Sequence, residues 1–444
     1  MTRRTESEFD TLVRDATAHH RAGRFGEAEA AYRAALRISP GHAAVMQNLG
    51  AVAAAQGEHR SAIGYFDDSI AAEPHYALAH YNRAILQRVL GKSREAIRGL
   101  ERVCALEPDH YDAHRALGFL WLAEGDRGRS LDHFARTYEL RRGEDRTSIA
   151  TESWTCATRS KLLHDCEQFR FLSKRHRDGR RFEIRARLYE EVAREFSDEV
   201  TELSSRQLDM LGEGYNTALN IRAAPELPGR VVSDRPDREA IVQRFTEHRT
   251  GAVFFDDLLT PPGLLRLKRF LLESTIWHDF SHIHGFVASY LEDGLACPLL
   301  LQIADEIRGT FPELLGKHPL SQAWAFKGLE TGAAIEAHAD DAAISVNFWV
   351  TPDEANISTG RSGLAVCRVP PPVAWDVKDY DADREPIAAF LEQHANETLI
   401  VPYRENRAVL FQSRLFHCSD ATEFATGYEN HRINMTLLFG RHGN

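Results

Sequence analysis

The stretch NLGAVAAAQGEHRSAIGYFDDSIAAEP (48–74) is one copy of a pattern that recurs through the first third of the chain. Its second glycine and its proline have equivalents 34 residues before and after them. The recurring positions are glycines at Gly23, Gly57, Gly91 and Gly125, small residues at Ala28, Ala62, Ala96 and Ser130, large residues at Tyr32, Phe66, Leu100 and Phe134, and prolines at Pro40, Pro74 and Pro108. Glycine readily ends a helix in the left-handed conformation, and proline cannot continue one. Each period therefore predicts two helices, with the small residue letting them approach closely.

A 34-residue period with these residues resembles the tetratricopeptide repeat, a helix–turn–helix unit. Four units cover residues 7–142, and the last has Arg142 in place of the proline. The resemblance implies an α-solenoid whose concave face binds a peptide or another protein. An array that only forms a homodimer, or only braces the downstream domain, is the alternative that the sequence leaves open.

Composition and charge indicate a cytoplasmic globular protein. The chain carries 65 acidic and 54 basic side chains, a net charge of −11, so it lacks the basic excess of a general nucleic-acid binder. No apolar run approaches the roughly 20 residues that span a bilayer, and the first residues have no signal-peptide core. Six cysteines without a Cys-x-x-Cys pair favour reduced thiols. We expect no nucleic-acid partner and no membrane partner.

The rest of the chain divides by its periodicity. Helical spacing persists over 143–222, and the apolar pattern of 187–211 predicts helix there. After a Pro/Gly-rich stretch at 224–236, short β-rich runs alternate with turn residues. These runs are 251–259, 321–329, 343–351, 362–369, 397–404, 407–413 and 432–440, with helices expected at 261–273 and 297–315. We predict a multidomain α + β protein: repeats in 1–142, a helical extension in 143–222, and a double-stranded β-helix (jelly-roll or cupin-like) domain in 223–444.

Four polar residues stand at the ends of these predicted strands. His338 and Asp340 form a His-x-Asp pair before the run 343–351, His417 follows the run 407–413, and Arg432 opens the last run. Alternate residues of an extended stretch point to one side, so His338 and Asp340 can share a ligand. Two further His-x-Asp pairs exist, His110/Asp112 at the start of a repeat helix and His176/Asp178 in a turn, and neither has strand neighbours.

This ordered set resembles the Fe(II)- and 2-oxoglutarate-dependent oxygenases, over about residues 240–442. The stretches NFWVTPDEAN (347–356), VPYRENRAVLFQSRLFH (401–417) and GYENHRINMTLLFG (427–440) are closest to the branch joined to tetratricopeptide repeats. The resemblance implies a catalytic Fe(II) held by His338, Asp340 and His417, with 2-oxoglutarate and O₂ as cosubstrates. Related halogenases have a small residue in place of this carboxylate, so Asp340 favours hydroxylation.

The resemblance also assigns residues to 2-oxoglutarate. Arg432 would take the distal carboxylate in a two-pronged grip. Asn434 shares its side of the strand and would add a hydrogen bond, although the family often has Ser there. Asn347 is a further candidate, for 2-oxoglutarate or for substrate. A satisfied core amide is the alternative for Asn434.

Three weaker groups surround these candidates. Gln322, Trp324 and Lys327 are candidates for lining the pocket, with core packing as the alternative for Trp324 and Phe326. His278, His282 and His284 suggest a substrate-facing loop, or less strongly a second metal, although no zinc-like partners lie nearby in sequence. The acidic segment 376–396 is expected to be a lid or a solvated insertion.

The predicted function is hydroxylation of an unactivated C–H bond in a peptide or protein side chain that the repeats recruit. Hydroxylation, desaturation or cyclisation of a free amino acid or peptide-like natural product is the first alternative. A non-catalytic repeat scaffold with a degenerate barrel is the second, and a 2-oxoglutarate-independent cupin is the third. Arg432 argues against the cupin, because a cosubstrate carboxylate is the obvious reason for it.

Overall fold

A computed structural model describes residues 3–143, 154–247, 251–280, 285–329, 334–358, 362–372, 375, 384–419 and 423–441. The contacts between residues divide the chain into two compact units, residues 1–120 and 121–444. The predicted domain boundaries at 142 and 222 stay predictions, and the two units are described separately below.

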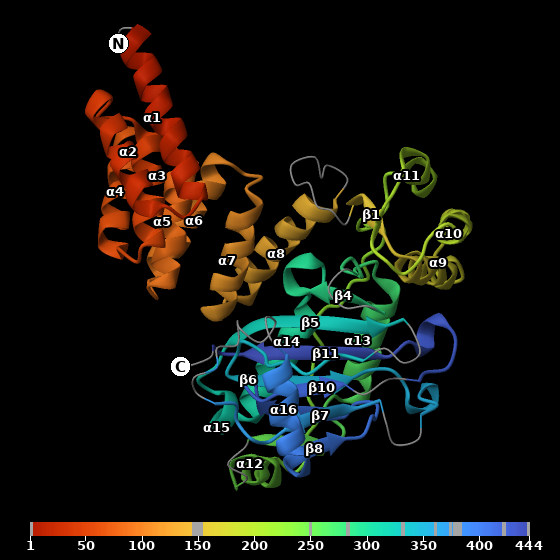
Figure 1. Cartoon of the computed structure of the whole chain (residues 1–444). Helices are drawn as coiled ribbons and strands as arrows, with labels where there is room; N and C mark the ends of the chain where they lie inside the picture. Colours follow the sequence, from red (N-terminus) through yellow and green to blue (C-terminus); the bar gives the residue numbers. More distant parts are fainter. Residues whose placement is uncertain are drawn as a thin grey trace. The chain divides into compact units, whose positions relative to one another are not determined.

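The first unit is an array of helix pairs, coloured red to orange in Figure 1. Its helices are α1 (Arg3–Arg21), α2 (Phe25–Ile38), α3 (Ala43–Ala55), α4 (His59–Ala72), α5 (Ala77–Val89), α6 (Ser93–Leu106) and the first part of α7 (Tyr111–Ala123). The glycine between the helices of each pair has a positive φ, as the sequence pattern requires. The small residues Ala28, Ala62 and Ala96 are fully buried beside the large residues of the same period. The prediction of helical repeats here is confirmed.

The second unit begins with helical segments. They are the end of α7, α8 (Arg127–Arg142), α9 (Arg159–Ser173), α10 (Gly179–Ala193) and α11 (Ser205–Leu211). The prediction of helix over 187–211 is wrong in its middle. Strand β2 (Thr201–Glu202) pairs there with β1 (Cys156–Ala157), and Ser204 starts α11 with a capping box. The Ser204 cap shows why helical spacing alone misled, since a residue that caps a helix also separates it from the previous one.

Two antiparallel sheets form the β-rich part of this unit (Figure 1). The larger has the order β3-β9-β6-β11-β5-β4 and the smaller the order β10-β7-β8. The strands are β3 (Ala252–Phe255), β4 (Phe286–Tyr290), β5 (Leu320–Gly328), β6 (Ile344–Trp349), β7 (Leu364–Cys367), β8 (Thr398–Val401), β9 (Ala408–Gln412), β10 (His417–Ser419) and β11 (Ile433–Phe439). Seven of these overlap the seven predicted runs, whereas β4 and β10 were not predicted.

A shared apolar core joins the two sheets. Trp349 and Phe411 of the larger sheet pack with Leu364, Val366 and Val401 of the smaller sheet, all buried. Helices α12 (Arg238–Glu247), α13 (Pro261–Glu273), α14 (Pro298–Thr310), α15 (Pro312–Leu315) and α16 (Glu385–Gln393) complete the unit. The expected helix 261–273 is α13, and the expected helix 297–315 is two helices, because Pro312 starts the second one.

Helix α16 lies in the segment expected to be a lid or insertion. Its Ile387 packs against Cys367 and Phe416, so this part of the segment is anchored to the smaller sheet. Residues 376–383 of the same prediction lie outside the described residues. Within the described part of the chain, no helix is both long and apolar enough to span a bilayer.

Candidate metal centre

The three predicted ligands meet where the two sheets face each other. His338 and His417 form an isolated antiparallel bridge, with N–O distances of 3.0 and 2.9 Å in the two directions. The Asp340 N–H donates to the Ser413 carbonyl at 2.9 Å. Two segments 79 positions apart in sequence, before β6 and at β10, are therefore held in register by backbone hydrogen bonds. This register directs all three side chains to one place.

The ligand atoms converge. One ligand atom from each of His338, Asp340 and His417 lies within 4.8 Å of the others. The Nε2 atoms of His338 and His417 lie 3.8 and 3.6 Å from the Asp340 carboxylate oxygens. Among the described residues this is the one group of three or more His, Cys, Asp and Glu that could hold a metal ion. Asp340 and His417 are buried, and His338 is partly exposed.

Neighbouring groups fix the orientation of every ligand. The Nδ1 atoms of His338 and His417 lie 2.8 and 3.0 Å from the carbonyl oxygens of Glu336 and Leu415. A carbonyl only accepts, so Nδ1 carries the proton in both rings and each Nε2 presents its lone pair. Ser345 donates to Asp340 Oδ2 at 2.6 Å and is itself 2.9 Å from the Ser413 hydroxyl. Such support of each ligand is typical of metal sites.

Burial keeps His417 in the form that binds a metal. Desolvation lowers the pKa of His417 to about 4, helped by His338 and opposed by Asp340. At neutral pH the ring is therefore uncharged. Two neutral imidazoles and one carboxylate are the donor set that Fe(II) takes on one face of an octahedron, so the residues present fit that metal.

All six predicted site residues line one cavity of about 30 Å³. Its lining is Trp324, Phe326, Ile335, His338, Asp340, Asn347, Leu364, His417, Ser419, Arg432, Asn434 and Thr436. The strand register explains the set. Thr436 of β11 lies between Asn347 of β6 and Trp324 of β5, and Asn434 pairs with Phe326. Alternation on β11 then places residues 432, 434 and 436 on the face toward the smaller sheet.

The 2-oxoglutarate candidates differ in their contacts. Arg432 is buried; its Nη2 lies 3.4 Å from the Gly363 carbonyl, and its guanidinium is 5.8 Å from the Trp349 ring. Asn434 donates to the Thr436 hydroxyl at 3.3 Å. Asn347 is buried, and its Oδ1 has no hydrogen-bond partner among the described residues. A buried amide with an unused oxygen beside three ligand residues fits a site built for a polar molecule.

The weaker candidates separate clearly. Trp324 and Phe326 line the cavity, so the core-packing interpretation of these two residues was wrong. Lys327 does not line it: neighbouring residues of a strand face opposite sides, and Lys327 is fully buried against Trp277 and Tyr428. Gln322 instead hydrogen-bonds Glu292.

His278 and the two other His-x-Asp pairs do not join the centre. His278 is buried and hydrogen-bonds Tyr138 and Asn216 at 2.8 and 3.0 Å, so its placement in a substrate-facing loop was wrong. His282 and His284 lie outside the described residues. His110 stands just before α7, where its Nδ1 accepts from Ala113 N–H, and His176 lies in the turn before α10.

Sequence reasoning missed two kinds of site residue. Thr436 was detectable, because it is the third polar residue at alternate positions of an otherwise apolar strand. Ser345 and Ser413 were not, since their effect on Asp340 depends on contacts that only folding creates.

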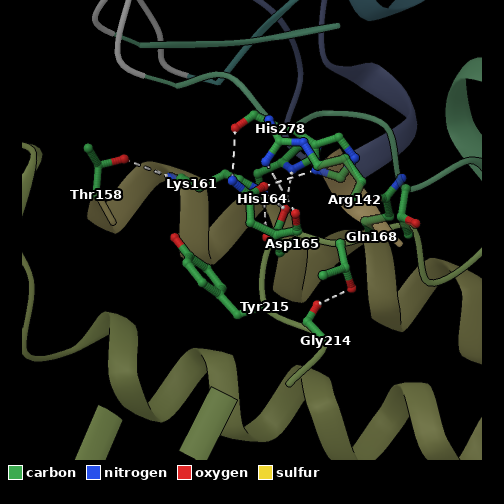
Figure 2. Close-up of polar contacts among 12 residues, drawn as sticks. Arg142, Thr158, Lys161, His164, Asp165, Gln168, Gly214, Tyr215 and His278 are labelled. Carbon is green, nitrogen blue, oxygen red and sulfur yellow. Dashed lines mark hydrogen bonds and ion pairs between the residues drawn. The ribbon is translucent and has the colours of Figure 1, made fainter. Parts of the chain in front are cut away.

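A buried polar cluster lies among α9 and the segments packed on it (Figure 2). Lys161 Nζ is 2.6 Å from both carboxylate oxygens of Asp165, and His164 Nδ1 is 3.0 Å from one of them. Nearby, Arg142 makes a two-pronged ion pair with Asp293 at 2.8 and 2.7 Å, both side chains being at most 2% exposed. Lys161 is thus buried even though it stands in a stretch of sequence that is rich in Arg and Lys.

Comparisons with known proteins concern the repeats. The tetratricopeptide repeat family model matches residues 14–77 and 81–145. A crystal structure of MamA is 20% identical, with a TM-score of 0.29, covering 32% of this chain and 80% of that one. The first tetratricopeptide domain of Spaghetti (RPAP3), bound to an HSP90 peptide, is 21% identical, with a TM-score of 0.26, covering 27% and 97%. An O-GlcNAc transferase mutant of Thermobaculum terrenum is 25% identical, with a TM-score of 0.29, covering 31% and 28%. No curated protein matches the chain.

Proposed function

We propose that this chain is an Fe(II)- and 2-oxoglutarate-dependent oxygenase. The observation that carries the proposal is the convergence of His338, Asp340 and His417 in one cavity with Arg432, between two antiparallel sheets. The double-stranded β-helix interpretation is supported by the shared core of those sheets. When bound, Fe(II) with 2-oxoglutarate would supply C–H hydroxylation by O₂, with release of succinate and CO₂.

The protein's own residues hold and orient the reactants. The backbone carbonyls of Glu336 and Leu415 fix the two histidine tautomers, and Ser345 holds the carboxylate of Asp340. Arg432 would bind the distal carboxylate of 2-oxoglutarate, and Asn347 has an unused amide oxygen in the same cavity. Trp324 and Phe326 give the cavity an apolar wall.

The cavity volume adds a requirement. A space of about 30 Å³ holds water molecules and not a five-carbon diacid. Binding of 2-oxoglutarate therefore requires lining side chains to move. The partly exposed Trp324 and Phe326 are the large ones among them.

The substrate proposed is a peptide or protein side chain, because the first unit is built of repeats whose usual ligands are peptides and proteins. The alternatives predict different behaviour. A degenerate barrel would bind no 2-oxoglutarate. A cupin would bind iron and be indifferent to Arg432. An oxygenase of free amino acids would turn over without any ligand of the repeats.

The test is succinate release from 2-oxoglutarate by anaerobically iron-loaded protein after O₂ is admitted. Metal content and 2-oxoglutarate binding are measured on the same samples. We expect His338→Ala to lose bound iron and succinate formation together. Arg432→Ala should keep iron but weaken 2-oxoglutarate binding by about 30-fold or more, the cost of deleting one partner of a buried charged pair.

Two matched substitutions control for nonspecific damage. His394→Ala and Arg187→Ala remove the same residue types from outside the cavity and should leave iron and 2-oxoglutarate binding unchanged. Iron-loaded wild-type protein that neither forms succinate nor binds 2-oxoglutarate would overturn the proposal and favour the scaffold.

A further inference from the structure

The second unit has a groove of about 730 Å³ whose lining shares no residue with the metal centre. Three segments form it: the end of α9 and the turn after it, the residues 220–227, and the outer face of α13. The lining is Leu172, Arg175, His176, Asn220, Ile221, Arg222, Ala223, Pro225, Leu227, Pro262, Leu265, Arg266, Arg269 and Glu273. A volume in this range is typical of ligand-binding clefts.

The groove is strongly basic in an acidic protein. Four arginines line it against one carboxylate, whereas the whole chain has a net charge of −11. Arg222 pairs with Glu273 at 2.5 Å, and Arg175 pairs with Glu429, outside the lining, at 3.3 Å. These side chains are 17–56% exposed, so an incoming carboxylate can compete for them.

Arg269 is exposed on the groove and open to an incoming anion. Within the described residues no carboxylate pairs with it and no acceptor takes its hydrogen bonds. To the described residues, Arg266 makes only long contacts, 3.4 and 3.5 Å, to the carbonyls of Pro225 and Glu226. Both arginines lie on the outer face of α13, where residues 262, 265, 266, 269 and 273 follow helical spacing.

Apolar side chains interleave with these charges. Leu265 and Ile221 are 51% and 48% exposed, and they belong to the small set of large hydrophobic side chains that the described structure leaves open. Pro225, Pro262 and Leu172 extend the apolar lining. Exposed apolar residues beside arginines without carboxylate partners are typical of a recognition surface, because a bound partner would both cover the apolar side chains and pair with the charges.

The walls of the groove are pinned in place. The side chain of Asn220 donates to the Glu273 carbonyl at 2.6 Å, and the Ser274 hydroxyl accepts from Arg222 N–H at 3.1 Å. Gln302 accepts from Leu227 N–H at 2.8 Å. The segment is fixed at one end to the C-terminal end of α13 and at the other to α14, which gives a preformed groove and lowers the entropy lost on binding.

We propose that this groove binds an acidic peptide segment that also carries aliphatic side chains. Among the described lining residues there is no Phe, Tyr or Trp on which a nucleic-acid base would stack. A small anion would use the arginines but leave Leu265 and Ile221 uncovered. An acidic–aliphatic peptide pairs with the arginines and covers both.

The test uses the full chain without iron or 2-oxoglutarate, so its outcome is independent of the oxygenase proposal. The probe is a fluorescein-labelled peptide of about ten residues, roughly 33 Å when extended, in which Asp and Glu alternate with Leu and Ile. Fluorescence anisotropy gives Kd. We expect binding that weakens as salt is added, and weakens when Ser replaces the aliphatic residues or Lys the acidic ones.

Variants locate the binding. Arg269→Glu should weaken the probe by about fivefold or more, and Arg269→Lys should retain most of the affinity, since charge and not geometry is required. Arg187→Glu is the matched control: Arg187 is exposed on α10, outside the groove, and its reversal should change Kd by less than about twofold.

Three results would overturn the proposal. The first is equal binding of the acidic probe and its lysine counterpart. The second is an Arg269→Glu affinity indistinguishable from that of Arg187→Glu, which would move the binding to another surface, such as the repeats. The third is tighter binding of a single-stranded oligonucleotide that competes with the peptide in wild-type protein and not in Arg269→Glu.

Discussion

Lys327 and His164 are two titratable side chains that are buried away from the metal centre. Lys327 is buried because alternation along β5 turns it to the face of the sheet opposite that centre. Residues 324 and 326 of β5 face the cavity, so Lys327 points away from it. Its Nζ lies 3.4 Å from the centroid of the Tyr428 ring and has no hydrogen-bond partner among the described residues. Burial lowers its pKa well below the usual value. His164, close enough for Lys327 to lower its pKa further, is also fully buried.

This burial makes the stability of the second unit depend on pH. Desolvation and Lys327 lower the pKa of His164 to about 3, against about 6.5 in an unfolded chain. The unfolded state therefore takes up a proton between pH 6.5 and 3 that the folded state refuses, and the free energy of unfolding falls as pH falls through that window. His278 is also buried with a lowered pKa, so it makes stability fall with pH in the same way. Asp165 also has a lowered pKa, and the stability that it provides is lost only when the pH falls below its ordinary value near 3.8.

We predict that His164→Asn makes the loss of stability between pH 6.5 and 5 smaller by about 1.6 kcal/mol, because the variant lacks the histidine that takes up a proton only when the chain unfolds. The amide can still donate to Asp165, so the contact at the Nδ1 position is kept. Urea unfolding at several pH values measures this slope. His394→Asn, at a partly exposed site, should unfold with the wild-type slope. Parallel slopes for wild type and His164→Asn would contradict the prediction.

The candidate site was predictable from sequence to the extent that it depends on alternation and order. His338 and Asp340 two positions apart, and Arg432 and Asn434 on the last strand, needed only the period of two. The backbone bridge between residues 338 and 417 did not follow from any pattern, because β10 is three residues long and was not predicted as a strand. His417 was identified as a ligand from the resemblance of the sequence to a known family. Physical reasoning on the sequence alone would not have paired it with His338.

At the scale of elements, close helix approach in the repeats depends on glycines that the 34-residue pattern does not single out. A Cβ built on Gly50 of α3 would lie 2.5 and 2.7 Å from two ring carbons of Phe66 in α4. Phe66 is 1% exposed, so its ring has no room to move away. A Cβ on Gly64, exposed in the middle of α4, would meet nothing within 4 Å.

These two glycines therefore predict opposite results for the same substitution. Gly50→Ala should destabilise the repeats by about 1–3 kcal/mol, the usual cost of overpacking a core. Gly64→Ala should stabilise them by about 0.5–1 kcal/mol, because alanine loses less backbone entropy in a helix. Thermal unfolding followed by circular dichroism measures both. Shifts of the same sign would show that the α3–α4 contact is not as close as described.

The elements themselves were predicted where periodicity was long. The repeat helices and seven strands lie where the sequence placed them, since each is supported by many residues of one pattern. Strand β4 and the break after α10 were missed for a different reason. Phe286–Tyr290 is a strand because it pairs with β5, and residues 194–204 leave the helix where β2 pairs with β1. Both outcomes depend on partners distant in sequence, and the break after α10 depends also on the Ser204 cap.

At the scale of the whole molecule, α8 belongs to the second unit even though the repeat pattern extends through it. The division after Leu120 leaves α8 with the sheets. Its Arg142 is fully buried in a two-pronged ion pair with Asp293, and its Tyr138 hydrogen-bonds the buried His278. A buried charge that loses its partner costs about 3–5 kcal/mol. The last helix of the repeat pattern is thus part of what stabilises the domain that follows.

Two shortened chains test this dependence. Both 121–444 and 143–444 contain every residue of the candidate metal centre, but only the first keeps α8. We expect 121–444 to unfold cooperatively and to bind Fe(II) as the full chain does, and 143–444 to unfold at lower urea or to aggregate, because Asp293 and His278 lose their partners.

In the full chain, Arg142→Met should lower the free energy of unfolding by about 3–5 kcal/mol, whereas Arg136→Met, which breaks an exposed pair with Glu139 on the same helix, should change it by less than about 1 kcal/mol. Equal stability of the two shortened chains, with equal effects of the two substitutions, would place α8 outside the cooperative unit and return the boundary to residue 142.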